Sequence, residues 1–175
     1  AYAADKVGSE LHARFACHVH GIPTTGLRFF NVYGPRQKLN TRFPGVIGAF
    51  LERASAGQPI TFYGDGNQVR DFIYVQDVVD FLLSAAVTQT AGSRVFNACS
   101  GSAISIIGLA GVVGDVLGCK PNFQFQPARP GDIAFSVGSP AAAIAEFGYG
   151  ASTSLRDGLM QTIAYDAAEL LRAAA

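Results

Sequence analysis

Short segments with the pattern of buried strands alternate along this 175-residue chain with longer segments that have the pattern of helices. The strand-like segments are rich in β-branched and aromatic residues and comprise 24–30, 60–63, 69–75, 94–98 and 122–126. The helix-like segments comprise 2–20, 43–56, 77–87, 105–117, 140–147 and 154–172. This alternation restricts the chain to the α/β class, in which helices cover a largely parallel sheet.

The first helix-like segment has the clearest apolar stripe. Four residues recur at four-residue spacing: Val7, Leu11, Phe15 and Val19. Gly21 is suited to the helix C-cap and Pro23 to the stop that follows it. We expect at least part of the stripe to pack on the sheet.

Three potential metal ligands lie at the end of this segment: Cys17, His18 and His20. Their spacing matches no common zinc pattern, and the sequence offers no second pair of ligands elsewhere. A helix end with surface histidines is therefore favoured over a metal site, and no metal is predicted.

The composition indicates a core-rich globular protein, because 49% of the residues are hydrophobic and 15% are charged. Thirteen basic residues balance thirteen acidic ones without a basic run, which disfavours nucleic acid or an anionic membrane as partner. No apolar run has the length of a membrane span. Cys17, Cys99 and Cys119 are scattered and odd in number, which is typical of thiols in a reducing cytoplasm, the location we expect.

Tyr2 and Lys6 are four residues apart, so on a helix both side chains lie on one face, one turn from each other. A free tyrosine, with a pKa of about 10, is a poor base at neutral pH. A lysine ammonium nearby favours the phenolate, and such a pair can transfer a proton from a sugar or alcohol hydroxyl. Alone the pattern decides little, since Tyr-x-x-x-Lys occurs by chance in roughly one chain in three of this length.

Polar loops follow several of the predicted strands. The segment 31–37 (NVYGPRQ) is predicted as a loop after strand 24–30, at the position where an α/β sheet places ligand contacts. Segment 64–67 is predicted as a tight turn, and 127–132 (PARPGD) as an extended loop that carries Arg129 and Asp132.

Gly108, Gly111 and Gly114 have the spacing of a dinucleotide-binding loop. In such a loop the first glycine leaves a strand directly, whereas here nine residues separate Ala98 from Gly108. We interpret these glycines as a small-residue packing face on the helix 105–117.

Four motifs occur in a familiar order: Tyr2-x-x-x-Lys6, LRFFNVYGPRQ at 27–37, YGDGNQVRDFIYVQDVV at 63–79 and ARPGD at 128–132. Together they resemble the extended short-chain dehydrogenase/reductases, and among these the NAD-dependent nucleotide-sugar epimerases and dehydratases. The resemblance extends from Tyr2 to the final helix. It implies a partial Rossmann-like parallel sheet with a smaller α/β substrate-binding lobe, and NAD as cofactor.

The resemblance also implies roles for individual residues. Tyr2 would be the base that takes the sugar hydroxyl proton, and Lys6 would favour its phenolate and bind the nicotinamide ribose. Phe29 would lie near the nicotinamide. The predicted nucleotide-sugar contacts are Asn31 and the arginines Arg70 and Arg129 at the diphosphate, Tyr63 at the base and Asp132 at the ribose. Arginine suits this task because its guanidinium pairs bidentately with phosphate oxygens.

Structural roles remain open for several of these residues. Phe29 could belong to the core. Arg70 could pair with Asp71 or Asp77, and Arg129 with Asp132, although the loop and strand-edge positions favour ligand binding. Separately, Asp65 and Asp77 are interpreted as turn and cap residues.

The family's glycine-rich loop, its acidic residue for the adenosine ribose and its Ser/Thr partner of the tyrosine have no counterpart in the 175 residues. The resemblance would place all three upstream of Tyr2. We therefore interpret the chain as a C-terminal half, and we expect these residues alone to be inactive.

The resemblance implies that residues 1–37 and 73–100 belong to the cofactor lobe, and 38–72 and 101–175 to the sugar-nucleotide lobe. The predicted activity is NAD-dependent epimerisation of a nucleotide-diphosphate sugar at C4 through a 4-keto intermediate, in a homodimer. Three alternatives remain: a nucleotide-sugar 4,6-dehydratase, a decarboxylase, and a truncated module that only binds the nucleotide sugar or dimerises. The pair Arg70-Asp71 favours the epimerase over the decarboxylase.

Overall fold

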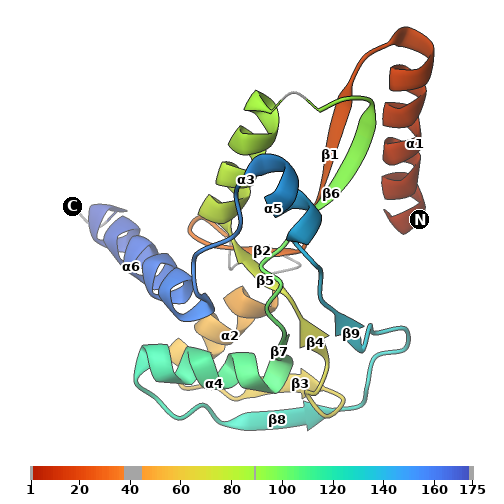
Figure 1. Ribbon diagram of the computed structural model, residues 1–175. Helices are drawn as coiled ribbons and strands as arrows, with labels where there is room; N and C mark the ends of the chain where they lie inside the picture. The colour runs from red at the N-terminus through yellow and green to blue at the C-terminus, as the bar shows by residue number, and fades with distance from the viewer. Residues whose placement is uncertain (1, 38–44, 89, 174–175) are drawn as a thin grey trace.

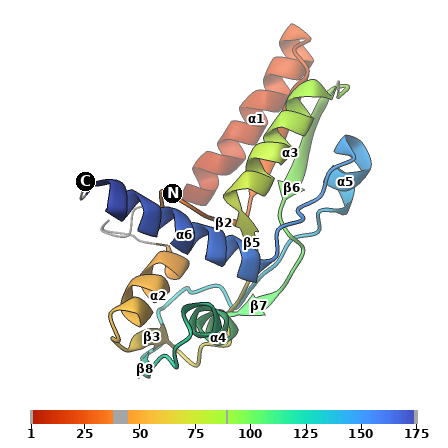
Figure 2. The same ribbon diagram turned by 90° about the vertical axis from the view of Figure 1, so that its left-hand side faces the viewer.

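The computed structural model describes residues 2–37, 45–88 and 90–173. The helices are α1 (Tyr2–His20), α2 (Val46–Ser55), α3 (Val75–Val87), α4 (Ile106–Leu117), α5 (Ala141–Phe147) and α6 (Leu155–Ala173). The strands are β1 (Thr24–Phe29), β2 (Asn31–Tyr33), β3 (Ile60–Tyr63), β4 (Val69–Arg70), β5 (Phe72–Tyr74), β6 (Ser93–Ala98), β7 (Ile104–Ser105), β8 (Phe123–Gln126) and β9 (Phe135–Ser136). Figure 1 and Figure 2 show an upper part with α1, α3, β1 and β6, and a lower part with α2, α4, β3 and β8.

Most strand pairs are parallel, as the alternation of elements predicts. β1 pairs with β6, β2 with β5, and β3 with β8, all in parallel. β4 lies between the antiparallel β7 and the parallel β9. The chain is thus an α/β protein with part of a Rossmann-like parallel sheet.

The chain changes strand partners between Phe30 and Asn31, where the two parts of the molecule meet. The N–H of Phe30 donates to the Ala98 carbonyl at the end of β6, at 3.2 Å. The next N–H, of Asn31, donates to the Asp71 carbonyl at 3.1 Å. This switch brings the carboxyl end of β1 beside the junction of β4 and β5.

Several helix ends agree with the segment bounds predicted from the sequence. Gly21 follows α1 with a φ of 66°, in the left-handed region that glycine adopts without strain. Ser105 caps α4 by accepting the N–H of Gly108 at 3.0 Å, and Pro140 precedes α5. Ser154 caps α6, because its Oγ accepts the N–H of Asp157 at 3.1 Å. α2 begins at Val46, and the expected start at residue 43 lies outside the described residues.

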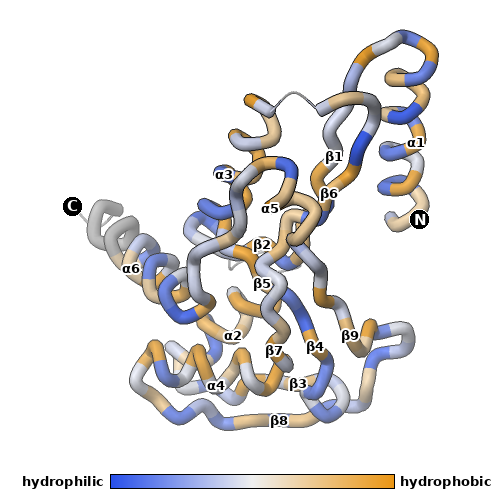
Figure 3. Tube along the Cα trace, viewed as in Figure 1, coloured by the Kyte–Doolittle hydropathy of each residue, from blue (hydrophilic) through white to orange (hydrophobic). Residues whose placement is uncertain are grey.

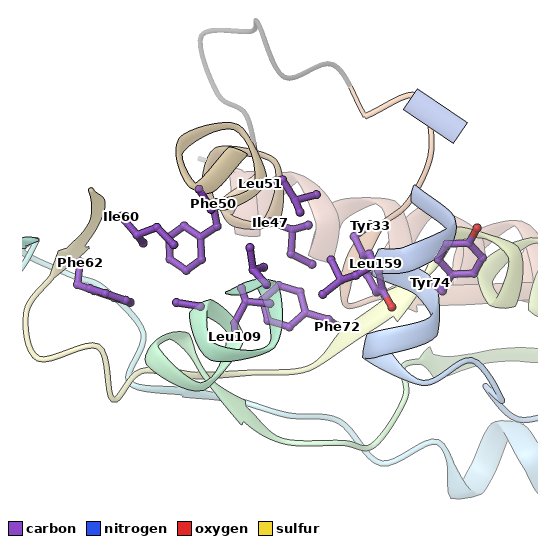
Figure 4. Close-up of a cluster of buried hydrophobic side chains, with 13 residues drawn as sticks. Tyr33, Ile47, Phe50, Leu51, Ile60, Phe62, Phe72, Tyr74, Leu109 and Leu159 are labelled. Carbon is purple, nitrogen blue, oxygen red and sulfur yellow. The ribbon is translucent and has the colours of Figure 1, made fainter. Parts of the chain in front are cut away.

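Two clusters of buried apolar side chains form the core. The larger one joins α2, β3, α4 and α6, and Figure 4 shows its side chains converging between these elements. Its labelled members are Tyr33, Ile47, Phe50, Leu51, Ile60, Phe62, Phe72, Tyr74, Leu109 and Leu159. The second cluster joins β5, α3, β6 and α5 and consists of Ile73, Val78, Phe81, Phe96, Ala98 and Ala143.

The apolar stripe of α1 is exposed, contrary to the expectation that part of it packs on the sheet. Its four residues, Val7, Leu11, Phe15 and Val19, are each more than half exposed. Hydrophobic and hydrophilic residues alternate along this helix in Figure 3. Instead, a bidentate ion pair attaches α1 to β1, with Arg28 donating to both carboxylate oxygens of Glu10 at 2.6 and 2.7 Å.

The sequence predictions were wrong at three element boundaries. Residues 31–33, predicted as loop, form β2 because their backbone groups pair with β5. The predicted strand 69–75 is divided into β4 and β5 at Asp71. α3 begins at Val75 rather than Asp77.

Asp65 is the predicted turn residue, but Asp77 is not a cap of its own helix. The Asp65 carboxylate accepts the N–H of Asn67 at 2.9 Å, which lowers the pKa of Asp65. Asp77 is buried and accepts the N–H groups of Ser152 and Thr153, just before α6. It therefore joins α3 to the start of the last helix.

The glycine run at 108–114 lies within α4, as predicted, but does not form one packing face. Gly114 is buried where a Cβ atom would meet Pro121 at 2.6 Å, whereas a Cβ atom at Gly111 would meet nothing within 4 Å. None of the helices in the described ranges is both long and apolar enough to cross a membrane.

Candidate active site

A cavity of about 310 Å³ lies between α2, β3, β4, α4 and the loop that follows β8. All five residues that the sequence predicts for nucleotide-sugar binding line it: Asn31, Tyr63, Arg70, Arg129 and Asp132. They come from four segments: β2, β3, β4 and the loop after β8. Phe62 and Phe50 close the apolar side of the cavity, and Thr61 and Gln68 add polar groups.

Arg70 lies at the end of β4 and is held by three acceptors. Its Nη1 donates to the carbonyls of Val69 at 2.9 Å and Ile133 at 2.5 Å, and its Nη2 donates to Asp132 Oδ1 at 2.9 Å. The Arg70 side chain is only 16% exposed. A guanidinium has five N–H groups, so Arg70 can keep these contacts and still donate to an anion in the cavity.

The ion pair between Arg70 and Asp132 differs from the pairs considered in the sequence analysis. Arg70 pairs with Asp132, sixty-two positions away, rather than with Asp71 or Asp77. Asp132 in turn pairs with Arg70 and not with Arg129. The pair fixes the 127–133 loop to β4.

Arg129 is placed over the ring of Tyr63. Its guanidinium carbon is 3.6 Å from the ring centroid, within the range of a cation–π contact. A cation–π contact uses the charge of the guanidinium, so it does not consume the five N–H groups as hydrogen-bond donors. Arg70 and Arg129 thus bring two permanent positive charges to one cavity, an arrangement that suits a diphosphate.

Asn31 is oriented by a single peptide group. Its backbone N–H and its side-chain Nδ2 both donate to the Asp71 carbonyl, at 3.1 and 2.8 Å. The Oδ1 of Asn31 is thereby turned to the side opposite the Asp71 carbonyl, since the two groups of one amide point apart.

Tyr2 and Lys6 lie one turn apart on α1, as their spacing predicts. Lys6 Nζ is 5.2 Å from the centroid of the Tyr2 ring, and the Tyr2 side chain is 75% exposed. The two residues do not line the cavity of Arg70 and Arg129.

Phe29 lines a different and larger cleft, of about 710 Å³, between β1 and α3. Its neighbours there are mostly apolar and include Leu27, Leu82 and Ala86. Phe29 is 47% exposed, so it is not a core residue of the described chain.

Two residues of this region were not singled out from the sequence. Gln68 lines the cavity and donates from Nε2 to the Tyr63 carbonyl at 2.6 Å, which supports the segment on which Arg129 stacks. Asp71 was considered as an ion-pair partner of Arg70 and as part of the pair that favours the epimerase, but not as a buried residue, and it is fully buried. The sequence signal for its burial was its position between Arg70 and the apolar run Phe72-Ile73-Tyr74. An aspartate is buried where several hydrogen-bond donors surround it.

A partial Rossmann-like sheet, an exposed Tyr/Lys pair on one helix and a cavity with two arginines define a short-chain dehydrogenase/reductase of the extended type. A family model described as "NAD dependent epimerase/dehydratase family" matches residues 1–99. The chain belongs to this family.

The chain is similar to curated and solved 4-epimerases. It is 30% identical to the UDP-glucose 4-epimerase of Mycolicibacterium smegmatis, over 94% of this chain and 52% of the relative. The structure of UDP-glucose 4-epimerase from Thermotoga maritima with UDP-glucose has a TM-score of 0.90 and 32% identity, covering 97% of this chain and 54% of that one.

A third similar protein, UDP-glucuronic acid 4-epimerase from Bacillus cereus, was solved with UDP-glucuronic acid and NAD. It has a TM-score of 0.84 and 26% identity, covering 96% of this chain and 52% of that one. The chain thus spans about half the length of the proteins it matches.

Proposed function

We propose that this chain supplies the nucleotide-sugar site and the catalytic tyrosine of an NAD-dependent nucleotide-sugar 4-epimerase. The observation that carries the proposal is the cavity that gathers Asn31, Tyr63, Arg70, Arg129 and Asp132. The 4-epimerases among the similar proteins support the reaction type.

In this proposal the cavity binds the nucleotide diphosphate part of the substrate. Arg70 and Arg129 donate to the diphosphate oxygens and Asn31 adds a neutral contact. Tyr63 lies against the base and Asp132 accepts from the ribose. Arg129 keeps its stacking on Tyr63, so one aromatic ring and one cation are presented together.

The fit of the chain to NAD is limited to the nicotinamide end. Tyr2 and Lys6 are exposed on one face of α1, where a ligand can reach them, and Lys6 would bind the nicotinamide ribose. Phe29 is exposed at the end of β1 and would lie near the nicotinamide. The dinucleotide pyrophosphate needs a glycine-rich turn between a strand and a helix, and the one glycine run with that spacing lies inside α4.

Tyr2 acts as the base. When bound, NAD would supply the hydride acceptor for the sugar C4 and the hydride donor to the opposite face of the 4-keto sugar. Tyr2 takes the proton of the C4 hydroxyl as the C4–H bond breaks, and it gives the proton back after the 4-keto sugar has turned over. Lys6, with its Nζ 5.2 Å from the centroid of the Tyr2 ring, places a positive charge beside the tyrosine during this step.

The test is the Tyr2→Phe variant in a protein completed with the N-terminal half of a close relative. We expect folding to be retained and turnover to fall by about two to four powers of ten. The matched control is Tyr165→Phe, which removes a hydroxyl that accepts from Arg36 at 2.9 Å on α6. Near-normal turnover of the Tyr2 variant contradicts the assignment.

A further inference from the structure

Asp71 is the buried carboxylate nearest in sequence to Arg70, and it has no role in the proposed chemistry. It interrupts the strand between β4 and β5 and has no exposed surface. Four donors surround its carboxylate. Oδ1 accepts the N–H and Oγ of Ser100 at 3.0 and 2.7 Å, and Oδ2 accepts the N–H groups of Gly101 and Gly138 at 2.9 and 3.3 Å.

These contacts join three segments that are far apart in the sequence. Ser100 and Gly101 follow β6, Gly138 follows β9, and Asp71 itself belongs to the β4–β5 connection. Figure 1 shows the chain from β6 to β7 and the chain from β9 to α5 passing beside β4 and β5. The carboxylate holds these three segments together by accepting hydrogen bonds from their backbone N–H groups, which would otherwise lack partners.

The backbone of Asp71 acts on the nucleotide-sugar cavity directly. Its carbonyl accepts both N–H groups that orient Asn31, and its amide nitrogen is bonded to Arg70. β4 has only two residues, so few ladder hydrogen bonds determine where Arg70 lies. A fixed point immediately after Arg70 therefore matters more than it would in a long strand.

We propose that Asp71 is a positioning residue of the nucleotide-sugar site. Its carboxylate fixes the β4–β5 connection to the loops after β6 and β9, and this holds Arg70 and Asn31 at the separation that the diphosphate requires. The inference rests on the proposed function, because it assigns Asp71 to the same cavity.

The Asp71→Asn variant tests this with the smallest change of shape. An asparagine has one acceptor oxygen and one NH₂ group. Backbone N–H donors face both carboxylate oxygens, so the NH₂ group meets a donor in either orientation. The three segments must then move apart, and small displacements of the groups that bind a ligand lower its affinity strongly.

Asp77→Asn is the matched control. Asp77 is 2% exposed and also has donors on both oxygens: Tyr149 Oη at 2.8 Å and the Ser152 N–H at 3.0 Å on Oδ1, and the Thr153 N–H at 3.3 Å on Oδ2. It joins α3 to α6 and contacts neither Arg70 nor Asn31. A purely structural loss should therefore affect both variants alike.

The measurement is UDP affinity by calorimetry, well below the melting temperature of each variant. We expect both variants to melt earlier, with UDP affinity about tenfold weaker in Asp71→Asn and within about twofold of the unmodified protein in Asp77→Asn. If Asp71→Asn does not fold, Ser100→Ala removes only the hydroxyl donor, and we expect it to weaken UDP binding about two- to fivefold.

Equal UDP affinity in the Asp71→Asn, Asp77→Asn and unmodified proteins would overturn the inference while leaving the cavity assignment intact. Equal weakening in both variants would also overturn it, since the effect would then be one of stability. If the unmodified protein does not bind UDP, the proposed cavity itself is wrong and the inference fails with it.

Discussion

The two arginines of the cavity should respond differently to truncation, although both are proposed to bind the diphosphate. Arg70 holds three protein acceptors with a side chain that is 16% exposed. Arg129 is exposed, and its guanidinium stacks on the Tyr63 ring. Arg70→Ala should therefore reduce both stability and ligand affinity, whereas Arg129→Ala should reduce mainly affinity.

The magnitudes follow from these contacts. Hydrogen bonds from a charged group contribute about 1.5–3 kcal/mol each, and much less where solvent screens them. Of the three bonds of Arg70, the one to Val69 is partly buried, whereas those to Ile133 and Asp132 are exposed. We expect Arg70→Ala to lose about 2–3 kcal/mol of unfolding free energy, which lowers the melting temperature by about 4–12 °C. Arg129→Ala loses an exposed cation–π contact of about 0.5–1 kcal/mol.

UDP affinity should fall by about 2–5 kcal/mol in each variant if the contacts are desolvated and charge-paired. Calorimetry gives the affinity and a thermal melt gives the stability of the same samples. Arg53→Ala is the control, because Arg53 donates to the Pro59 carbonyl at 3.0 Å on α2 and does not line the cavity.

Two results would refute this reasoning. Unchanged UDP affinity in both variants would exclude the arginines from the diphosphate site. An equal loss of stability in the two variants would show that the contacts of Arg70 with Asp132, Val69 and Ile133 stabilise the fold no more than the stacking of Arg129 on Tyr63 does.

Three further predictions concern the whole chain. Burial raises the pKa of the Cys99 thiol from 9.0 to about 11. The thiol therefore ionises first in the unfolded state, and the free energy of unfolding should fall between pH 9 and 11. Urea titrations should show a smaller fall over this pH range in the Cys99→Ala variant. NAD titration of the 175-residue chain should show no measurable binding, and micromolar affinity would contradict the proposal that the cofactor pyrophosphate site lies elsewhere. The exposed stripe of α1 suits a self-association surface, so we expect the completed enzyme to be a homodimer. Sedimentation that shows only monomer at micromolar concentration would contradict this prediction.

The class of fold, most of the elements and the residues that line the candidate cavity could be predicted from the sequence alone. Strand and helix periodicities depend on neighbouring residues, and so do caps such as Ser105 and Ser154. The motifs also selected five residues as candidates for ligand binding, and all five line one cavity.

Only the tertiary structure decided which groups pair. Arg70 pairs with Asp132 rather than with the adjacent Asp71, because β4 places its guanidinium beside the loop after β8. The Asp71 carboxylate instead accepts backbone N–H groups of the segment after β6. Residues 31–33 form a strand because β5 offers backbone partners. The α1 stripe remains exposed while other residues of that helix, Glu10 and Ala13, contact β1. Such outcomes depend on segments tens of residues apart, and local sequence patterns carry no information on that separation.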